Sequence, residues 1–189
     1  MLMLITAMPM ASAAQPGREL THDPPKLLWS AGASFDVRDR SPTGGFGFRL
    51  EREMWPGYDL GLVTADIRLR IHFATLTEFT DSYRHLEVPV ELTAYDFGLS
   101  ALAMSEFFIL EPYLGPGIGW EVYNAYEDGF GPKQLRDLNP HVSLIAGTRL
   151  PIHPHVAPFV EYRFSQLIGT ESYTHSRQHR LSFGVAMNF

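Results

Sequence analysis

Hydrophobic and polar residues alternate along most of this chain with a period of two, which is typical of β-strands rather than helices. The last segment shows the pattern most clearly. One of its faces carries only apolar side chains: Leu181, Phe183, Val185, Met187 and Phe189. The residues between them are polar or small. This alternation predicts a strand with one apolar and one polar face.

The same pattern recurs seven more times from residue 27 onward. The predicted strands are 29–37, 46–54, 65–73, 86–95, 108–122, 142–150, 160–165 and 180–189. In the segment 86–95, the pattern puts Leu92 and Ala94 on the apolar face, and Glu91 and Tyr95 on the polar face. A closed up-and-down barrel requires an even number of strands. We therefore predict an all-β chain that forms an eight-stranded antiparallel up-and-down barrel.

The links between these strands differ in length. Tight turns that contain proline are expected at 55–59 and 151–154. Longer polar links are expected at 38–45, 78–85, 123–138 and 169–178. The stretch 96–106 fits neither class, because it is apolar where a short turn should lie. Short turns at one rim and longer loops at the other are typical of membrane barrels, with the short turns in the periplasm.

The polar face of the predicted strands combines glycine with charges of both signs. The charged residues that we expect to point into the barrel lumen are Asp36, Arg49, Glu51, Glu53, Asp66, Arg68, Arg70, Glu87, Glu91, Glu111, Glu121, Arg149, Glu161, Arg163 and Arg180. The opposite face is almost free of charge, with Arg52 as the main exception. In a soluble barrel the charged face meets water. In a membrane barrel the apolar face meets lipid and the charges pair inside.

Several features favour the membrane arrangement. Aromatic residues that suit an interfacial girdle lie near the predicted strand ends: Trp29, Trp55, Tyr58, Trp120 and Tyr123. The chain has no apolar run long enough for a transmembrane helix, so strands would have to cross the bilayer. An eight-stranded barrel is filled by its own side chains. The lumenal charges therefore predict a paired plug rather than a diffusion channel.

The composition and the N-terminal residues narrow the possible classes of protein further. The chain has no cysteine, which excludes a disulfide framework and a cysteine metal site. Its net charge of -6 argues against nucleic-acid binding. Residues 1–14 are predicted to be a short signal peptide without a basic start, since an apolar run precedes the small residues Ala11-Ser12-Ala13. Residues 15–26 then form a flexible periplasmic leader, and 27–189 form the barrel domain.

The C-terminal strand 181–189 resembles the terminal signal of bacterial outer membrane proteins, which ends in phenylalanine after alternating apolar residues. The segment 112–119, with the sequence PYLGPGIG, and the segment 86–90, LEVPV, are similar to strands of the small OmpA/OmpX/opacity-type porin-family barrels. This resemblance implies a location in the outer membrane, among its lipids and lipopolysaccharide. It also implies recognition of Phe183, Val185, Met187 and Phe189 by the barrel assembly machinery. We expect no periplasmic peptidoglycan-binding domain, because the chain stops at the barrel.

These observations predict a non-enzymatic structural or surface protein without a cofactor, whose extracellular loops serve recognition or adhesion. One alternative is a lipid-modifying enzyme resembling lipid A deacylases. His175 and Ser176, with Glu171 and His179 nearby, are its candidate catalytic residues. Adjacent residues on a strand point to opposite faces, however, so His175 and Ser176 would not meet in an extended segment.

Two further interpretations remain beside these. The first is a soluble exported barrel whose apolar faces line a ligand cavity. The second is a metal bound by His153 and His155, which share a face if the segment is extended. Since no third ligand lies nearby in sequence, a solvated turn is the preferred interpretation of the two histidines.

Overall fold

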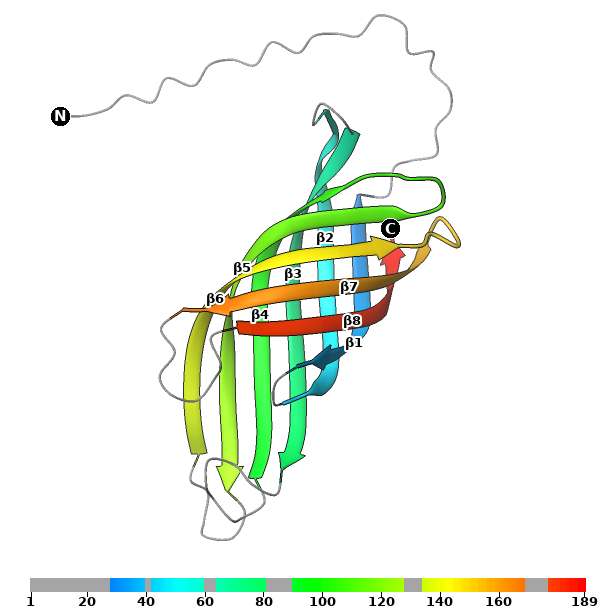
Figure 1. Cartoon of the computed structure of the whole chain (residues 1–189). Coiled ribbons are helices and arrows are strands. Elements are labelled where there is room, and N and C mark those ends of the chain that lie inside the picture. Colours follow the sequence, from blue (N-terminus) through cyan, green and yellow to red (C-terminus); the bar gives the residue numbers. More distant parts are fainter. Residues whose placement is uncertain (1–27, 40–41, 60–63, 81–89, 128–133, 169–176) are drawn as a thin grey trace, which may run out of the picture.

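Eight antiparallel strands close into a barrel in which each strand pairs with its sequence neighbours and β8 pairs with β1 (Figure 1). The computed structural model describes residues 28–39, 42–59, 64–80, 90–127, 134–168 and 177–189. The strands are β1 (Trp29–Arg38), β2 (Gly44–Asp59), β3 (Thr64–Thr80), β4 (Val90–Met104), β5 (Glu111–Glu127), β6 (Gln134–Arg149), β7 (Val156–Leu167) and β8 (Arg177–Asn188). The predicted fold class is confirmed. The predicted signal peptide, the leader and Glu87 lie outside the described residues.

Several strands are longer than the alternation predicted. β3 and β5 have 17 residues each, whereas about 10 suffice to cross a bilayer. The predicted links 78–85 and 123–138 are therefore partly strand, and in Figure 1 the ends of β3 to β6 extend beyond the short strands β1 and β8. The predicted turn 55–59 is also wrong, because β2 continues to Asp59 through two register shifts around Trp55. Gly57, with a φ of 64°, lies within the second of these shifts, between Trp55 and Tyr58.

The fourth strand was predicted with its two faces exchanged. Leu92 and Ala94 are fully buried, whereas Glu91 and Tyr95 are exposed. The stretch that fitted no class, 96–106, belongs largely to this strand, because β4 runs to Met104. Its lumenal positions carry leucine and alanine at one end, which inverts the expected polarity. Phe108, which was assigned to the next strand, instead lies in the turn before β5 with a φ of 56°.

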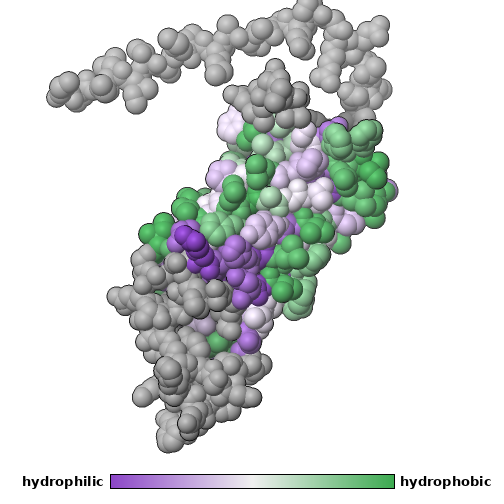
Figure 2. Space-filling view, viewed as in Figure 1, coloured by the Kyte–Doolittle hydropathy of each residue, from purple (hydrophilic) through white to green (hydrophobic). Residues whose placement is uncertain are grey.

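The exterior of the barrel is apolar and its interior is charged. Ile71 is 57% exposed, whereas its chain neighbour Arg70 is 1% exposed and Arg149 is completely buried. Many of the exposed side chains are large and apolar, and on the face shown in Figure 2 such apolar areas lie beside a hydrophilic patch. The apolar faces therefore do not line an internal cavity, so the ligand-binding soluble barrel does not fit this structure. Within the described ranges, no helix is long and apolar enough to span a membrane.

Two small apolar clusters lie inside the barrel, on either side of the charges along β4. One contains Leu76 and Leu92 with Ala74, Ala94 and Tyr123. The other contains Leu102, Met104, Tyr113 and Ile145. Between them on β4 lie Asp96, Gly98 and Ser100, which are also buried. Tyr123 is thus a lumenal residue and not part of the exterior aromatic girdle that the sequence suggested.

Candidate functional site in the barrel lumen

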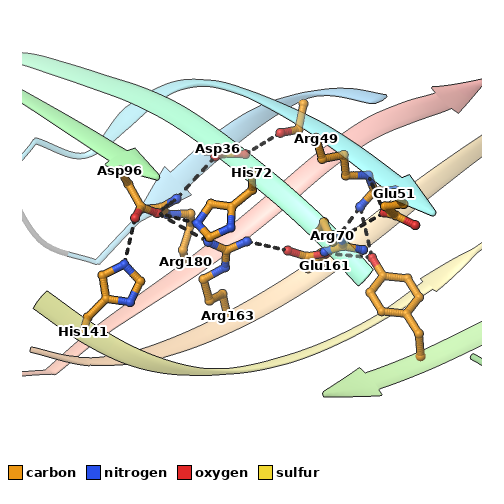
Figure 3. Close-up of polar contacts among 12 residues, drawn as sticks. Asp36, Arg49, Glu51, Arg70, His72, Asp96, His141, Glu161, Arg163 and Arg180 are labelled. Carbon is orange, nitrogen blue, oxygen red and sulfur yellow. Dashed lines mark hydrogen bonds and ion pairs between the residues drawn. The ribbon is translucent and has the colours of Figure 1, made fainter. Parts of the chain in front are cut away.

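Asp96 is the centre of the first group of buried polar side chains. Its Oδ2 atom lies 2.6 Å from Nη1 of Arg180 and 3.4 Å from Nη1 of Arg163. Its Oδ1 atom lies 2.8 Å from Nε2 of His141, and Nε2 of His72 is 3.3 Å from Oδ2. Figure 3 shows these four side chains converging on the carboxylate from four different strands. One carboxylate thus connects β4 with β3, β6, β7 and β8.

Glu51 and Glu161 form the second group, which holds three arginines. Arg70 bridges the two carboxylates, with its Nε atom 2.8 Å from Glu51. Arg149 also pairs with Glu51, and Arg49 lies 3.3 Å from each carboxylate. The hydroxyl of Tyr113 donates a hydrogen bond of 2.9 Å to Glu161. A fully buried ion pair is stable only when its charges are mutually compensated, which this arrangement provides.

The two groups are joined across the lumen by Arg163. Its Nη2 atom lies 3.3 Å from Glu161, while Nη1 faces Asp96. A third group adjoins the first: Nη1 of Arg38 lies 2.6 Å from Glu121, and Asp36 lies 3.8 Å from Nη1 of Arg180. The first two groups and Asp36 therefore form one connected network rather than isolated pairs, and the Arg38–Glu121 pair is a further buried ion pair. The lumenal cavity beside this network has a volume of about 20 Å³, which is room for about one water molecule.

Glycines on β4 and β5 make room for the two histidines of the first group. His72 is in register with Gly98, Gly98 with Gly119, and Gly119 with His141. A Cβ atom at Gly98 would lie 2.8 Å from the ring of His72, and one at Gly119 would lie 2.8 Å from the ring of His141. The two rings therefore occupy the space that side chains on the middle strands would fill.

The predicted lumenal charges fall into four groups according to their burial in the structure. Ten are buried: Asp36, Arg49, Glu51, Glu53, Arg70, Glu121, Arg149, Glu161, Arg163 and Arg180. Asp66, Arg68 and Glu111 are half-buried, and Arg68 pairs with Glu53 at 3.4 Å. Glu91 is exposed, so its assignment to the lumen is wrong, because the faces of its strand were exchanged. Glu87 lies outside the part of the chain that the structure describes.

Sequence reasoning missed several members of the network. Asp96 fell in the stretch that had no assigned structure, and Arg38 in a predicted link. His72 and Tyr113 lie on faces that the alternation had marked as polar, yet neither was counted as a site residue. His141 could have been found by extending the alternation of β6 by one residue, since Val142 and Leu144 point outward. Only the pairing of distant strands brings His72 and His141 to Asp96, Tyr113 to Glu161, and Arg38 to Glu121.

The group of His72, Asp96 and His141 has the composition of a metal site. One potential ligand atom from each residue lies within 4.8 Å of the others. However, Arg163 and Arg180 both contact Oδ2 of Asp96, and Nη1 of Arg163 also faces Nε2 of His72. A divalent cation there would meet two guanidinium groups and would have to displace one of them. The residues present therefore fit an ion-pair network better than a metal centre.

The exterior wall carries a histidine from the proposed catalytic set. His179 is exposed on β8, and its Nδ1 atom forms a 2.5 Å hydrogen bond with the hydroxyl of Tyr162 on β7. The serines of β1, β4, β6, β7 and β8 are buried or half-buried, so none of them lies on the exterior beside His179. The other proposed catalytic residues, Glu171, His175 and Ser176, lie outside the described residues. His153 and His155 are exposed in the turn before β7, with ring centroids 5.6 Å apart.

Solved structures with the same architecture include small barrels of bacterial outer membranes. Neisserial surface protein A matches with a TM-score of 0.59 and 16% identity over 86% of this chain and 96% of that protein. The attachment invasion locus protein Ail of Yersinia pestis matches with a TM-score of 0.54 and 14% identity over 86% and 97%. The outer membrane enzyme PagL matches with a TM-score of 0.50 and 12% identity over 85% and 99%. This is the fold of a small outer membrane barrel.

The resemblance drawn from the C-terminal strand is thus confirmed at the level of the fold. The apolar exterior and this fold together indicate a bacterial outer membrane location, as the sequence predicted. The sequence matches no protein-family model and no curated protein. PagL is an outer membrane enzyme, and Ail is an attachment invasion locus protein. The fold that they share is therefore compatible with either kind of role.

Proposed function

We propose that this chain is a closed, non-enzymatic outer membrane barrel that carries extracellular loops for recognition or adhesion. The main support is the lumen, where arginine and carboxylate side chains from several strands pair across the middle of the barrel. Apolar clusters lie on both sides of these pairs along β4. A lumen filled in this way favours a rigid scaffold over a pore. The function then belongs to the segments at the rims.

Strand lengths support a role for the extracellular rim. The ends that flank links 81–89 and 128–133 belong to β3 to β6, which have 15 to 17 residues each. Because about 10 residues cross the bilayer, these hairpins extend into the surrounding medium. Residues on projecting hairpins with a rigid base suit binding to a partner. Ail, an attachment protein by its name, shares this barrel architecture.

Conductance in planar lipid bilayers tests the closed barrel. We expect the purified protein to insert without producing open channels, because paired side chains fill the lumen. The double variant Glu51→Ala/Glu161→Ala removes the anions that hold three arginines, and we expect it to conduct or to fluctuate. Stable channels in the wild type would contradict the closed barrel.

Adherence of whole bacterial cells to host-cell and matrix surfaces tests the recognition role. A strain that displays the protein would be compared with one that displays a variant in which 128–133 is replaced by a glycine-serine link. We expect the variant to fold but to lose adherence to host-cell and matrix surfaces, measured by flow cytometry. Equal adherence by the variant and by cells without the protein would refute recognition through this link.

The lipid-modifying alternative has a separate test. Lipopolysaccharide from cells that express the wild type or Ser176→Ala would be compared by mass spectrometry for loss of an acyl chain. A non-enzymatic barrel leaves lipid A unchanged in both strains. Loss of an acyl chain in the wild type but not in the variant would replace the proposed function with hydrolysis.

A further inference from the structure

The exterior wall of β2 to β5 contains an apolar groove whose lining includes one exposed cation. The groove has a volume of about 560 Å³. Its walls include Leu50, Ile71, Leu99 and Ile118, which lie in register across four neighbouring strands. Arg52 is part of the same lining. Most of the lining side chains are exposed on the barrel exterior, whereas Arg70 and Ser100 in the same lining are buried lumenal residues, so the groove opens on the exterior surface.

The small side chain of Ala101 forms part of the groove floor. Ala101 is in register with Leu69, and Leu69 with Arg52, so the three lie in one row. Leu99 and Ile118 in the adjacent row are each more than half exposed. An alanine beside larger side chains leaves a channel in the wall. A channel whose exposed walls beyond Arg52 are apolar suits a hydrocarbon chain.

Arg52 lies midway along β2, at the level where β1 begins. It is in register with Trp29, the first residue of β1, and Trp29 exchanges backbone hydrogen bonds of 2.9 and 3.1 Å with Phe189. Its guanidinium carbon lies 5.2 Å from the centre of the Trp29 ring. Tryptophan and arginine side chains at a rim mark the level of lipid headgroups. Leu99 and Ile118 lie one row further from the end of the barrel that carries Trp29, so the groove leads from the level of Arg52 into the apolar belt.

Arg52 lacks a partner of opposite charge. Among the described residues no carboxylate forms an ion pair with it, although every buried arginine of the lumen network has one. Its neighbours on the exterior face of β2 are Leu50 and Met54, both apolar. A lipid-facing arginine is unfavourable unless an anion or water reaches it. A guanidinium binds the oxygens of a phosphate group through two parallel hydrogen bonds.

We propose that this groove binds one glycerophospholipid molecule of the periplasmic leaflet. Its phosphate rests on Arg52 beside Trp29, and one acyl chain lies in the groove over Ala101. The rim that carries both Trp29 and Phe189 also carries the short turns, which face the periplasm in barrels of this kind. The lipid of that leaflet therefore presents its phosphate at the level of Arg52.

Photocrosslinking tests this site in the intact barrel. The protein would be placed in phosphatidylethanolamine nanodiscs that contain a trace of the same lipid with a diazirine on one acyl chain. After irradiation, mass spectrometry would locate the labelled peptides. We expect labelling to concentrate on the peptides that carry Leu99 and Ile118. Even labelling around the apolar belt would overturn the proposal, because it is what a non-specific lipid shell gives.

Three variants separate the headgroup from the acyl chain. Arg52→Leu removes the phosphate contact, and we expect about tenfold less groove labelling. Arg52→Lys keeps a positive charge and is expected to keep part of the labelling. Ala101→Leu fills the floor and should reduce labelling while Arg52 remains. Ala33→Leu enlarges an exposed alanine on β1, outside the groove, and serves as the matched control.

Competition identifies the lipid class. Addition of lipopolysaccharide to the nanodiscs should leave groove labelling unchanged, because lipopolysaccharide belongs to the other leaflet. If it displaces the labelled lipid, or if Arg52→Leu labels like the wild type, the phospholipid site is refuted. Unboiled samples of each variant on SDS gels verify that the barrel is folded. This outcome is independent of adherence and of lipid A hydrolysis, so it is separable from the proposed function.

Discussion

Asp96 connects more strands than any other carboxylate described above, since Arg180, Arg163, His72 and His141 contact it from four strands. Such a residue is the partner on which several buried groups depend. When one member of a buried ion pair is removed, the charge left behind stays desolvated without compensation. The stability of the barrel should therefore be more sensitive to Asp96 than to a charge at the rim.

Asp96→Ala should lower the free energy of unfolding by about 3–5 kcal/mol, because Arg180 and Arg163 lose their shared counter-charge. Urea unfolding in detergent micelles or lipid vesicles, followed by tryptophan fluorescence, measures the change. Glu111→Gln, at a half-buried position at the start of β5, is the control and should change stability by no more than about 0.5 kcal/mol. Equal effects of the two substitutions would show that the network does not depend on Asp96.

At the scale of the strand, the pairs that cross β3 to β6 depend on glycine. Gly98 and Gly119 lie between His72 and His141 in one row, and their missing side chains leave space for the two rings. This explains why the polar faces of β4 and β5 combine glycine with charge. A Cβ at Gly98 would also lie 2.4 Å from the backbone oxygen of Ile118, which cannot easily move.

Gly98→Ala should destabilise the barrel by about 1–3 kcal/mol through overpacking. Gly44→Ala is the matched control, because the nearest atom to a Cβ at Gly44 is 3.8 Å away. Urea midpoints of the two variants, measured under the same conditions as the wild type, give the comparison. If both variants unfold at the wild-type midpoint, the row of glycines is not tightly packed.

A second prediction at this scale concerns the last strand, β8, and the residue that follows it. Phe189 exchanges backbone hydrogen bonds with Trp29, and its side chain is exposed together with those of Phe183, Val185 and Met187. Since none of these side chains fills the core, Phe189→Ser should leave refolding from urea into detergent nearly unchanged. In cells, the same variant should accumulate less folded barrel if the assembly machinery recognises this strand. Leu181→Ser, on the same exterior face, is the control.

At the scale of the whole molecule, closure of β1 on β8 leaves no strand edge open. The closed barrel should resist SDS until it is heated, so boiled and unboiled samples should migrate differently on a gel. A double variant that breaks the network, Glu51→Ala/Glu161→Ala, should lose this difference at a lower temperature than the wild type. Identical migration of the wild-type samples would refute a closed barrel that is stable in SDS.

The alternation of residues was enough to predict the strand number, the closed barrel and most of the lumenal charges, because the side-chain period of a strand is two. It failed at Leu92 and Ala94. An apolar residue satisfies the alternation equally well on a lipid-facing or a lumenal position, and the barrel has apolar layers on both. Strand ends were also uncertain, since nothing in the local pattern marks where the membrane stops.

The sequence by itself therefore determined the eight-stranded barrel architecture and its location in the outer membrane, where the apolar exterior meets lipid. Only the tertiary structure decided which charges pair, because Asp96 on β4 is far in sequence from Arg163 and Arg180, which are register partners on β7 and β8. The groove beside Arg52 also depends on that register, which sets Leu50, Ile71, Leu99 and Ile118 side by side. Alternation specifies the face of each residue, whereas register specifies its neighbours across the sheet.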